Sequence, residues 1–191
     1  MRGLIFGAAL LGAALSVSVS AKAPAAGDEA QIRSVIHRVY ESYTMPPPDA
    51  PTDGSYAPEN DAGSAMDGYE PPYTATLNIL VDRWGSLMKS SDELYRLNSF
   101  DWFCQCQDND NRTAKILKQN YAAVGKDRID VNVLFSPGRS ESGDSGEPLL
   151  FRFKREAGVW KLDDLKFYKF TTLRKALARD IQDVSKDRGR N

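Results

Sequence analysis

The sequence is poor in the residues on which metal and nucleophile chemistry usually depends. It has one histidine, His37, and two cysteines, Cys104 and Cys106, among 191 residues. Zinc sites draw mainly on several His and Cys ligands, so the chain offers too few for one. It also has no Gly-x-Ser-x-Gly motif, phosphate-binding loop or dinucleotide-binding fingerprint. We therefore expect neither a metal nor a cofactor, and the sequence identifies no catalytic residue.

An excess of charge is missing too, because 25 Lys and Arg residues stand against 26 Asp and Glu residues. Nucleic-acid-binding domains usually have a clustered basic face, so this balance gives no reason to expect a nucleic-acid partner. The apolar run Leu4–Leu15 is shorter than the roughly 20 residues that span a bilayer. We expect no membrane span in the mature chain.

Residues 1–21 have the three parts of a secretory signal peptide. Arg2 supplies the positive charge, Leu4–Leu15 the apolar region, and Val19-Ser20-Ala21 a small-residue cleavage site. The sequence predicts export, to the periplasm or the medium, after cleavage near Ala21. Residues 22–191 are then expected to form a single domain.

The stretch from Arg128 to Tyr168 predicts three antiparallel strands. Apolar and polar residues alternate with a period of two, as in strands that are buried on one side. Glu156-Ala157-Gly158 predicts a three-residue hairpin loop with glycine at the position of positive φ. The strands are predicted over Arg128–Phe135, Pro148–Arg155 and Val159–Tyr168, after a first strand over Thr113–Val124.

Helical spacing of apolar residues predicts helices over Asp28–Tyr43 and Thr74–Lys89, and a final helix capped by Thr171 or Thr172. Asp28 and Gln31 resemble a capping box. His37 falls away from the apolar face and is expected in solvent. Helices followed by strands indicate an α+β domain.

Residues 45–72 differ in composition from the rest of the chain. They hold seven of the ten prolines and six acidic residues, without any Lys or Arg. Such a composition predicts a loop rather than a second domain. The alternative is a lid or a partner-recognition arm, because long loops in compact domains are often functional.

The segment from Phe100 to Asp110 combines acids, amides and aromatics. Read as an extended chain, it places Asp101, Phe103 and Gln107 on one face, where they can line a concave site, while a structural turn is the alternative. Cys104 and Cys106 are one residue apart, so either a strained disulfide or two buried thiols is possible. A calcium-binding loop starting at Asp108 would need glycine at its sixth position and a bidentate acid at its twelfth. The chain has Thr113 and Gln119 there, so calcium binding is not expected.

Asp163 and Asp164 are the second candidate site. Neighbouring side chains on a strand point to opposite faces, so Asp164 is expected to share a face with Trp160 and Leu162. A carboxyl group buried beside Trp160 can act as a general acid or base. The alternative is a structural acid paired with Arg152, Lys154 or Arg174, or bonded to the backbone.

Three motifs together resemble a family of exported bacterial proteins called domain of unknown function 3828. They are Asp101-x-Phe103…Gln107-Asp108, Gly158-x-Trp160-Lys161-Leu162-Asp163-Asp164, and Thr172-Leu173-Arg174-x-x-Leu177. Two departures are Trp102, where the family usually has proline, and the Cys-x-Cys pair. The resemblance implies the cone-shaped, nuclear-transport-factor-2-like superfamily, in which N-terminal helices pack in a strongly curved antiparallel sheet and leave a pocket. That superfamily contains isomerases, dehydratases and pure binding domains.

Two functions follow as hypotheses. The first is a non-enzymatic exported binding module for a small envelope ligand or a protein partner. The second is a small enzyme that transfers protons with Asp101, Asp108 or Asp164. The absence of a nearby His or Tyr in the sequence favours the first. The candidate pocket or binding residues are Asp101, Phe103, Gln107, Asp108, Trp160 and Asp164.

Overall fold

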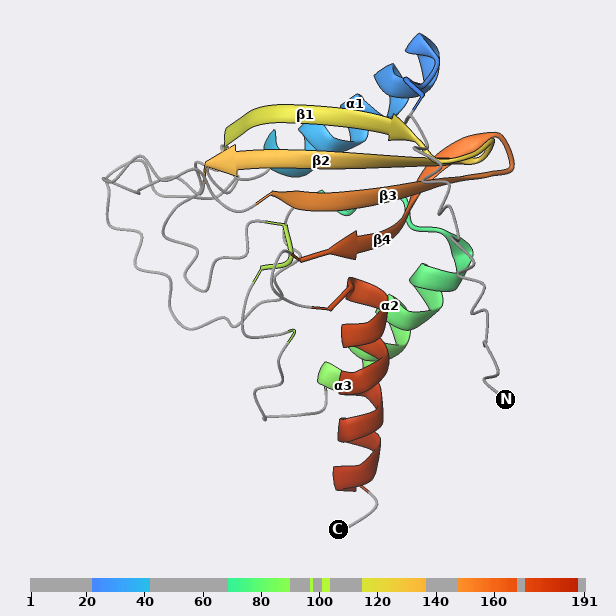
Figure 1. Ribbon diagram of the computed structural model, residues 1–191. Coiled ribbons are helices and arrows are strands. Elements are labelled where there is room, and N and C mark those ends of the chain that lie inside the picture. The colour runs from blue at the N-terminus through green and yellow to red at the C-terminus, as the bar shows by residue number, and fades with distance from the viewer. Residues whose placement is uncertain are drawn as a thin grey trace, which may run out of the picture.

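The computed structural model describes residues 22–41, 69–89, 97, 101–103, 115–136, 148–167 and 171–188. Within these ranges two helices precede four strands, and a third helix follows them (Figure 1). The predicted α+β class is confirmed. The elements are α1 Ala26–Glu41, α2 Ala75–Met88, β1 Lys115–Ala123, β2 Arg128–Ser136, β3 Leu149–Glu156, β4 Val159–Lys166 and α3 Leu173–Arg188.

The four strands form one curved antiparallel sheet in the order β1-β2-β3-β4. Their bounds lie within two residues of the predicted ones. The predicted alternation is confirmed in β2 and β3, because every second residue is buried, for example Val131 opposite Phe151. Each strand therefore has a core-facing side, and an outward side occupied mainly by polar residues.

The helices bury one face of this sheet. Helix α1 crosses behind the strands and contacts β1 and β4, whereas α2 and α3 pack against each other and against β4 (Figure 1). The other face of the sheet, toward the viewer in Figure 1, carries no helix in the described part of the chain. Pro72–Thr74 covers the free edge of β4, since the Leu162 amide donates to the Pro72 carbonyl at 2.8 Å.

Aromatic rings fill the space between the helices and the sheet. The ring of Tyr40 lies 5.6 Å from that of Phe135 and 6.5 Å from that of Phe151, between centroids. Phe103 stacks on the other side of Phe151 at 6.0 Å. Such ring pairs contribute packing energy beyond the area that they bury. The interior where the cone-fold resemblance implies a pocket is therefore occupied by side chains of the chain itself.

Two local predictions were wrong. The β3–β4 hairpin has a two-residue loop, because Glu156 pairs directly with Val159. Ala157 and Gly158 both have positive φ, 50° and 81°, which suits the right-handed twist of a two-residue hairpin. Asp28 is not the cap of α1, because the helix starts two residues earlier at Ala26.

Several predictions fall on residues outside the described ranges. These are the signal peptide at residues 1–21, most of the 45–72 segment, Cys104 and Cys106 with their redox state, and the calcium-like loop from Asp108. His37 is described and lies exposed on α1, as predicted. Among the described helices, none is long and apolar enough to cross a membrane.

Candidate functional site

A β-bulge in β4 decides where the two adjacent aspartates point. Phe153 pairs with Leu162 and Arg152 pairs with Asp164, so Asp163 is an extra residue between the two pairs. One inserted residue reverses the alternation of faces beyond it. Asp164 therefore shares a face with Arg152. The prediction that it lies with Trp160 and Leu162 was wrong.

Asp164 caps the start of α3. Its Oδ1 accepts hydrogen bonds from the backbone amides of Leu165 at 3.0 Å and Arg174 at 3.1 Å. Its Oδ2 lies 4.0 Å from Nη1 of Arg152. The first turn of α3 has no acidic residue of its own, so this carboxylate supplies the negative charge that a helix N-terminus favours.

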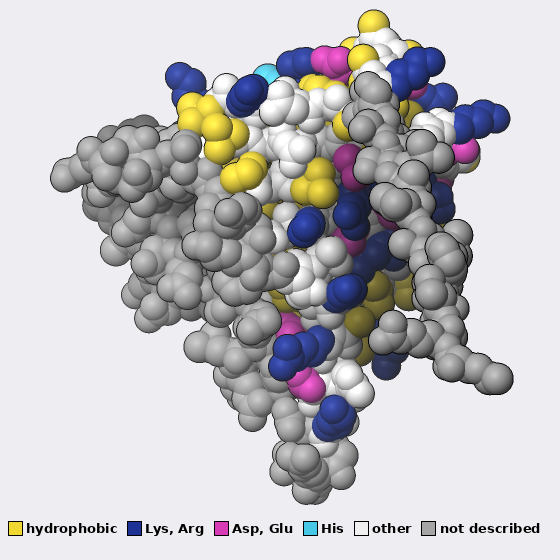
Figure 2. All heavy atoms as spheres, viewed as in Figure 1, with side chains coloured by type: hydrophobic (Ala, Val, Ile, Leu, Met, Phe, Trp, Pro, Cys, Tyr) yellow, Lys and Arg dark blue, Asp and Glu magenta, His cyan; other side chains and the backbone are white. Residues whose placement is uncertain are grey.

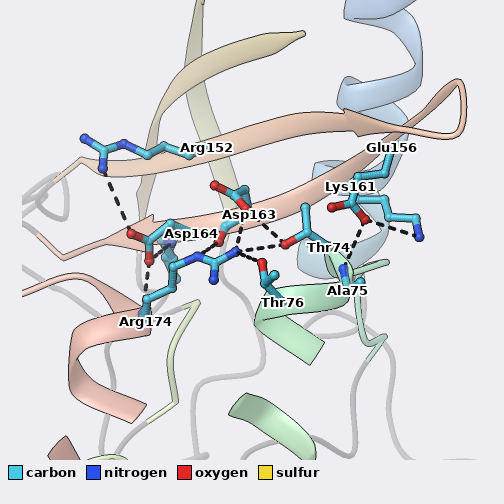
Figure 3. Close-up of polar contacts among 10 residues, drawn as sticks. Thr74, Ala75, Thr76, Arg152, Glu156, Lys161, Asp163, Asp164 and Arg174 are labelled. Carbon is cyan, nitrogen blue, oxygen red and sulfur yellow. Dashed lines mark hydrogen bonds and ion pairs between the residues drawn. The ribbon is translucent and has the colours of Figure 1, made fainter. Parts of the chain in front are cut away.

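Asp163 is linked to the start of α2 by hydrogen bonds to Thr74 and Arg174 (Figure 3). Its Oδ1 accepts from the Thr74 hydroxyl at 3.0 Å and from Arg174 Nη2 at 2.5 Å. The same Nη2 lies 2.9 Å from Thr74 Oγ1 and 2.8 Å from Thr76 Oγ1, and Nε donates to the Asp163 carbonyl at 2.6 Å. Arg174 thus joins β4, α2 and α3.

A third carboxylate completes this polar cluster. Oε2 of Glu156 accepts from the amide of Ala75, the first residue of α2, at 3.0 Å, and lies 3.8 Å from Nζ of Lys161. Helix N-termini bind anions readily. At both α2 and α3 this role is already filled by carboxylates of the chain itself. We call Thr74, Thr76, Glu156, Asp163, Asp164 and Arg174 the helix-start cluster.

The helix-start cluster contains residues from two of the three motifs behind the family resemblance. Asp163 and Asp164 come from one motif and Arg174 from the other, and both motifs meet here. Their contacts account for them as structural residues. Thr74 and Thr76 carried no signal in the sequence, because Thr74 lies 89 residues from its partner Asp163.

Asp101 and Phe103 lie in a buried turn. The prediction that they belong to an extended chain was therefore wrong. The amide of Phe103 donates to Oδ1 of Asp101 at 2.7 Å, and the two residues are 8% and 5% exposed. The Phe103 carbonyl accepts from the hydroxyl of Tyr40 at 3.0 Å. This arrangement fits the structural alternative, in which an aspartate holds a turn by its own backbone bonds.

Buried tyrosines surround this turn. Burial, and secondarily the charge of Asp101, raises the pKa of Tyr40 well above its ordinary value. Burial also raises the pKa of Tyr73, with smaller contributions from the charges of Glu70 and Asp101. A low-dielectric environment disfavours the phenolate, so both side chains stay protonated near neutral pH.

Trp160 lies on the core side of β4 and is 2% exposed. The guanidinium of Arg155 lies 4.5 Å from the centre of its ring and also pairs with Asp28 of α1. Trp160 and Asp164 thus face opposite sides of the sheet and do not form the predicted acid–aromatic site. The remaining candidates, Gln107 and Asp108, lie outside the described ranges.

Three buried aromatic side chains have a polar atom without a hydrogen-bond partner in the described part of the chain: Tyr73, Trp84 and Trp160. A shallow, open depression on α1 is lined by Ala26, Glu29, Ala30, Arg33, Ser34 and His37. Its lining comes from one side of a single helix, so it lacks converging groups. Within the described residues, no three His, Cys, Asp or Glu side chains come together to hold a metal.

Comparisons with known proteins add no relative. No family model matches the chain, and neither a curated protein nor a solved structure matches it. The resemblance to domain of unknown function 3828 therefore stays a prediction.

Proposed function

We propose that the chain is a non-enzymatic exported binding module of the cone-shaped, nuclear-transport-factor-2-like type, which recognises an envelope partner through its surface. One observation carries the proposal. Asp101 and Asp164, two of the three predicted acid–base groups, are buried and hydrogen-bonded to backbone amides. In each of them Oδ1 is already engaged by the backbone, and Oδ2 of Asp164 lies 4.0 Å from Nη1 of Arg152. These contacts give both carboxylates a structural role.

The packing of the interior supports the same proposal. Catalytic pockets are enclosed and keep a few polar groups pointing inward. Here Tyr40, Phe103, Phe135 and Phe151 occupy the space between α1 and the sheet. Recognition through an outer surface is compatible with a filled interior, whereas proton transfer inside the cone is not.

The test compares the purified chain with its Asp164→Asn variant. Each protein is first checked for folding by circular dichroism and then incubated with an extract of envelope metabolites, which is followed by mass spectrometry. We expect no metabolite to be consumed by either protein. The same proteins are immobilised and exposed to envelope proteins of the host, and both are expected to retain the same partner.

Turnover of a metabolite by the parent chain, abolished in folded Asp164→Asn, contradicts the proposal and supports the enzyme alternative. Turnover that survives in Asp164→Asn but is lost in Asp108→Asn contradicts it as well and assigns the chemistry to Asp108.

A further inference from the structure

The outward face of the sheet carries a row of three cations. The register places Arg128 of β2 directly opposite Lys154 of β3, and Lys154 directly opposite Lys161 of β4. Like charges directly opposite each other on neighbouring strands destabilise a sheet. Cross-strand repulsion therefore disfavours this row, and binding to an anionic partner would offset the repulsion.

The next row across the same strands shows the arrangement that stability favours. Asp130, Arg152 and Asp164 alternate in sign on β2, β3 and β4. Arg152 lies 3.8 Å from Asp130 and 4.0 Å from Asp164, between Nε or Nη1 and a carboxylate oxygen. In the three-cation row, Arg128 lies near Asp130 and Lys161 near Glu156, whereas the central Lys154 has no carboxylate within 4 Å in the described ranges.

The outward face as a whole is basic in a chain of net charge −1. Its seven cations stand against three carboxylates, so it has a net charge of +4. Figure 2 views this face and shows dark blue Lys and Arg side chains over the strands, with little magenta between them. The cations are Lys115, Lys118, Arg128, Arg152, Lys154, Lys161 and Lys166, and the carboxylates are Asp130, Glu156 and Asp164.

Several of these cations are free to meet a partner. Lys118, Lys154 and Lys166 are exposed, and in the described ranges no carboxylate oxygen lies within 4 Å of any of them. Arg128 has one carboxylate neighbour, Asp130, with Nε 3.4 Å from Oδ1. Since neighbouring strands are about 4.8 Å apart, the three-cation row spans about 10 Å. Carboxylates on one short acidic segment can reach all three.

We infer that this basic outward face binds an acidic segment of a partner protein, with Lys154 at the centre of the contact. The inference rests on the proposed function and gives the binding module its partner class. Charge complementarity of this kind speeds encounter and selects partners.

Other features of the face favour a protein over other polyanions. Its outward strand positions hold no aromatic side chain on which unpaired bases can stack. Val159, which pairs with Glu156 and is 52% exposed, adds an apolar contact of the kind found in protein interfaces.

The test uses a short fluorescein-labelled peptide in which Glu and Ser alternate, and a control peptide in which Gln replaces Glu. We expect the purified chain to raise the anisotropy of the acidic peptide alone, with an affinity that falls as salt is added. Lys154→Glu should weaken binding at least about tenfold, because it reverses the charge at the centre of the row. Its melting temperature should be equal or higher, because repulsion within the sheet is removed.

Arg179→Glu on α3 is the matched control. Arg179 is 68% exposed and pairs only loosely with Asp183, at 3.7 Å. The substitution changes the net charge of the chain by the same amount as Lys154→Glu. It should leave peptide affinity within about twofold of the parent, since a distant exposed charge is screened.

Equal binding of the two peptides overturns the inference, as does equal weakening by Lys154→Glu and Arg179→Glu. Tighter binding to duplex DNA or to phosphatidylglycerol vesicles than to the acidic peptide also overturns it, in favour of that other polyanion. If Lys154→Glu still retains the envelope partner of the parent chain, the assignment to this face is wrong while the binding-module proposal stands. Metabolite turnover is the separate result that contradicts the proposed function itself.

Discussion

The two faces of the sheet use polar residues in opposite ways. On the core side, polar groups are few, and the carboxylate of Asp101 is bonded to a backbone amide. On the outward side, Arg128, Lys154 and Lys161 stand in one row with only partial compensation. The polar contacts on the core side stabilise the fold. The repulsion between neighbouring cations on the outward side destabilises it. The proposed binding of an acidic segment to the outward side would account for this difference.

The largest expected loss of stability comes from a substitution on the core side of the sheet. Phe153 is fully buried and stacks on Phe151, with ring centroids 6.4 Å apart. Phe153→Ala should lower the free energy of unfolding by about 3–5 kcal/mol, because it removes buried apolar surface and leaves a cavity. Urea denaturation followed by tryptophan fluorescence measures this loss.

Lys154→Ala is the control for Phe153→Ala, since Lys154 is the next residue and faces solvent. It should change the free energy of unfolding by no more than about 0.5 kcal/mol. Losses of similar size in the two variants contradict the distinction between the faces.

The two adjacent aspartates give the next comparison. Asp164→Ala should lower the free energy of unfolding by about 2–3 kcal/mol, because it leaves the buried amide of Leu165 and the part-buried amide of Arg174 without an acceptor. Asp163→Ala should cost about 1 kcal/mol, because its side chain is 26% exposed and water replaces part of its contacts. Chemical denaturation of both variants is the measurement, and a reversed order contradicts the role of the β-bulge.

The smallest effect distinguishes two buried tyrosines. The Tyr40 hydroxyl donates to the Phe103 carbonyl, whereas the Tyr73 hydroxyl has no partner in the described ranges. Tyr40→Phe should cost about 1 kcal/mol, and Tyr73→Phe should be neutral or stabilise by up to about 1 kcal/mol. Thermal unfolding at neutral pH measures both.

The pH dependence of stability tests the burial of Tyr73 in a second way. Burial raises the folded-state pKa of Tyr73 above its ordinary value of 10.0, and raises that of Tyr121 to about 12. The resulting stability is complete below the unfolded-state pKa and is lost as the pH rises toward the folded-state pKa. Stability should therefore fall above about pH 10, and less steeply in Tyr73→Phe, which cannot ionise. Identical slopes for parent and variant contradict the burial of a protonated Tyr73.

The strands and helices were predictable because their signals are local. Alternation with a period of two and helical spacing gave each element to within two or three residues, since both patterns record which side of an element is buried. The β-bulge at Asp163 left no such signal. An extra residue in a strand can be recognised only from its pairing with the neighbouring strand. The face on which Asp164 lies was therefore predicted wrongly.

The sequence alone therefore determined the α+β class, the order of the elements and the buried positions of β2 and β3. Only the tertiary structure decided which distant residues meet: Thr74 with Asp163, Asp164 with the start of α3, and Arg128 with Lys154 and Lys161. Periodicity records burial along one element, but contacts between elements depend on register and packing. The candidate site and the basic outward face both arise from such contacts, which is why neither could be read from the sequence.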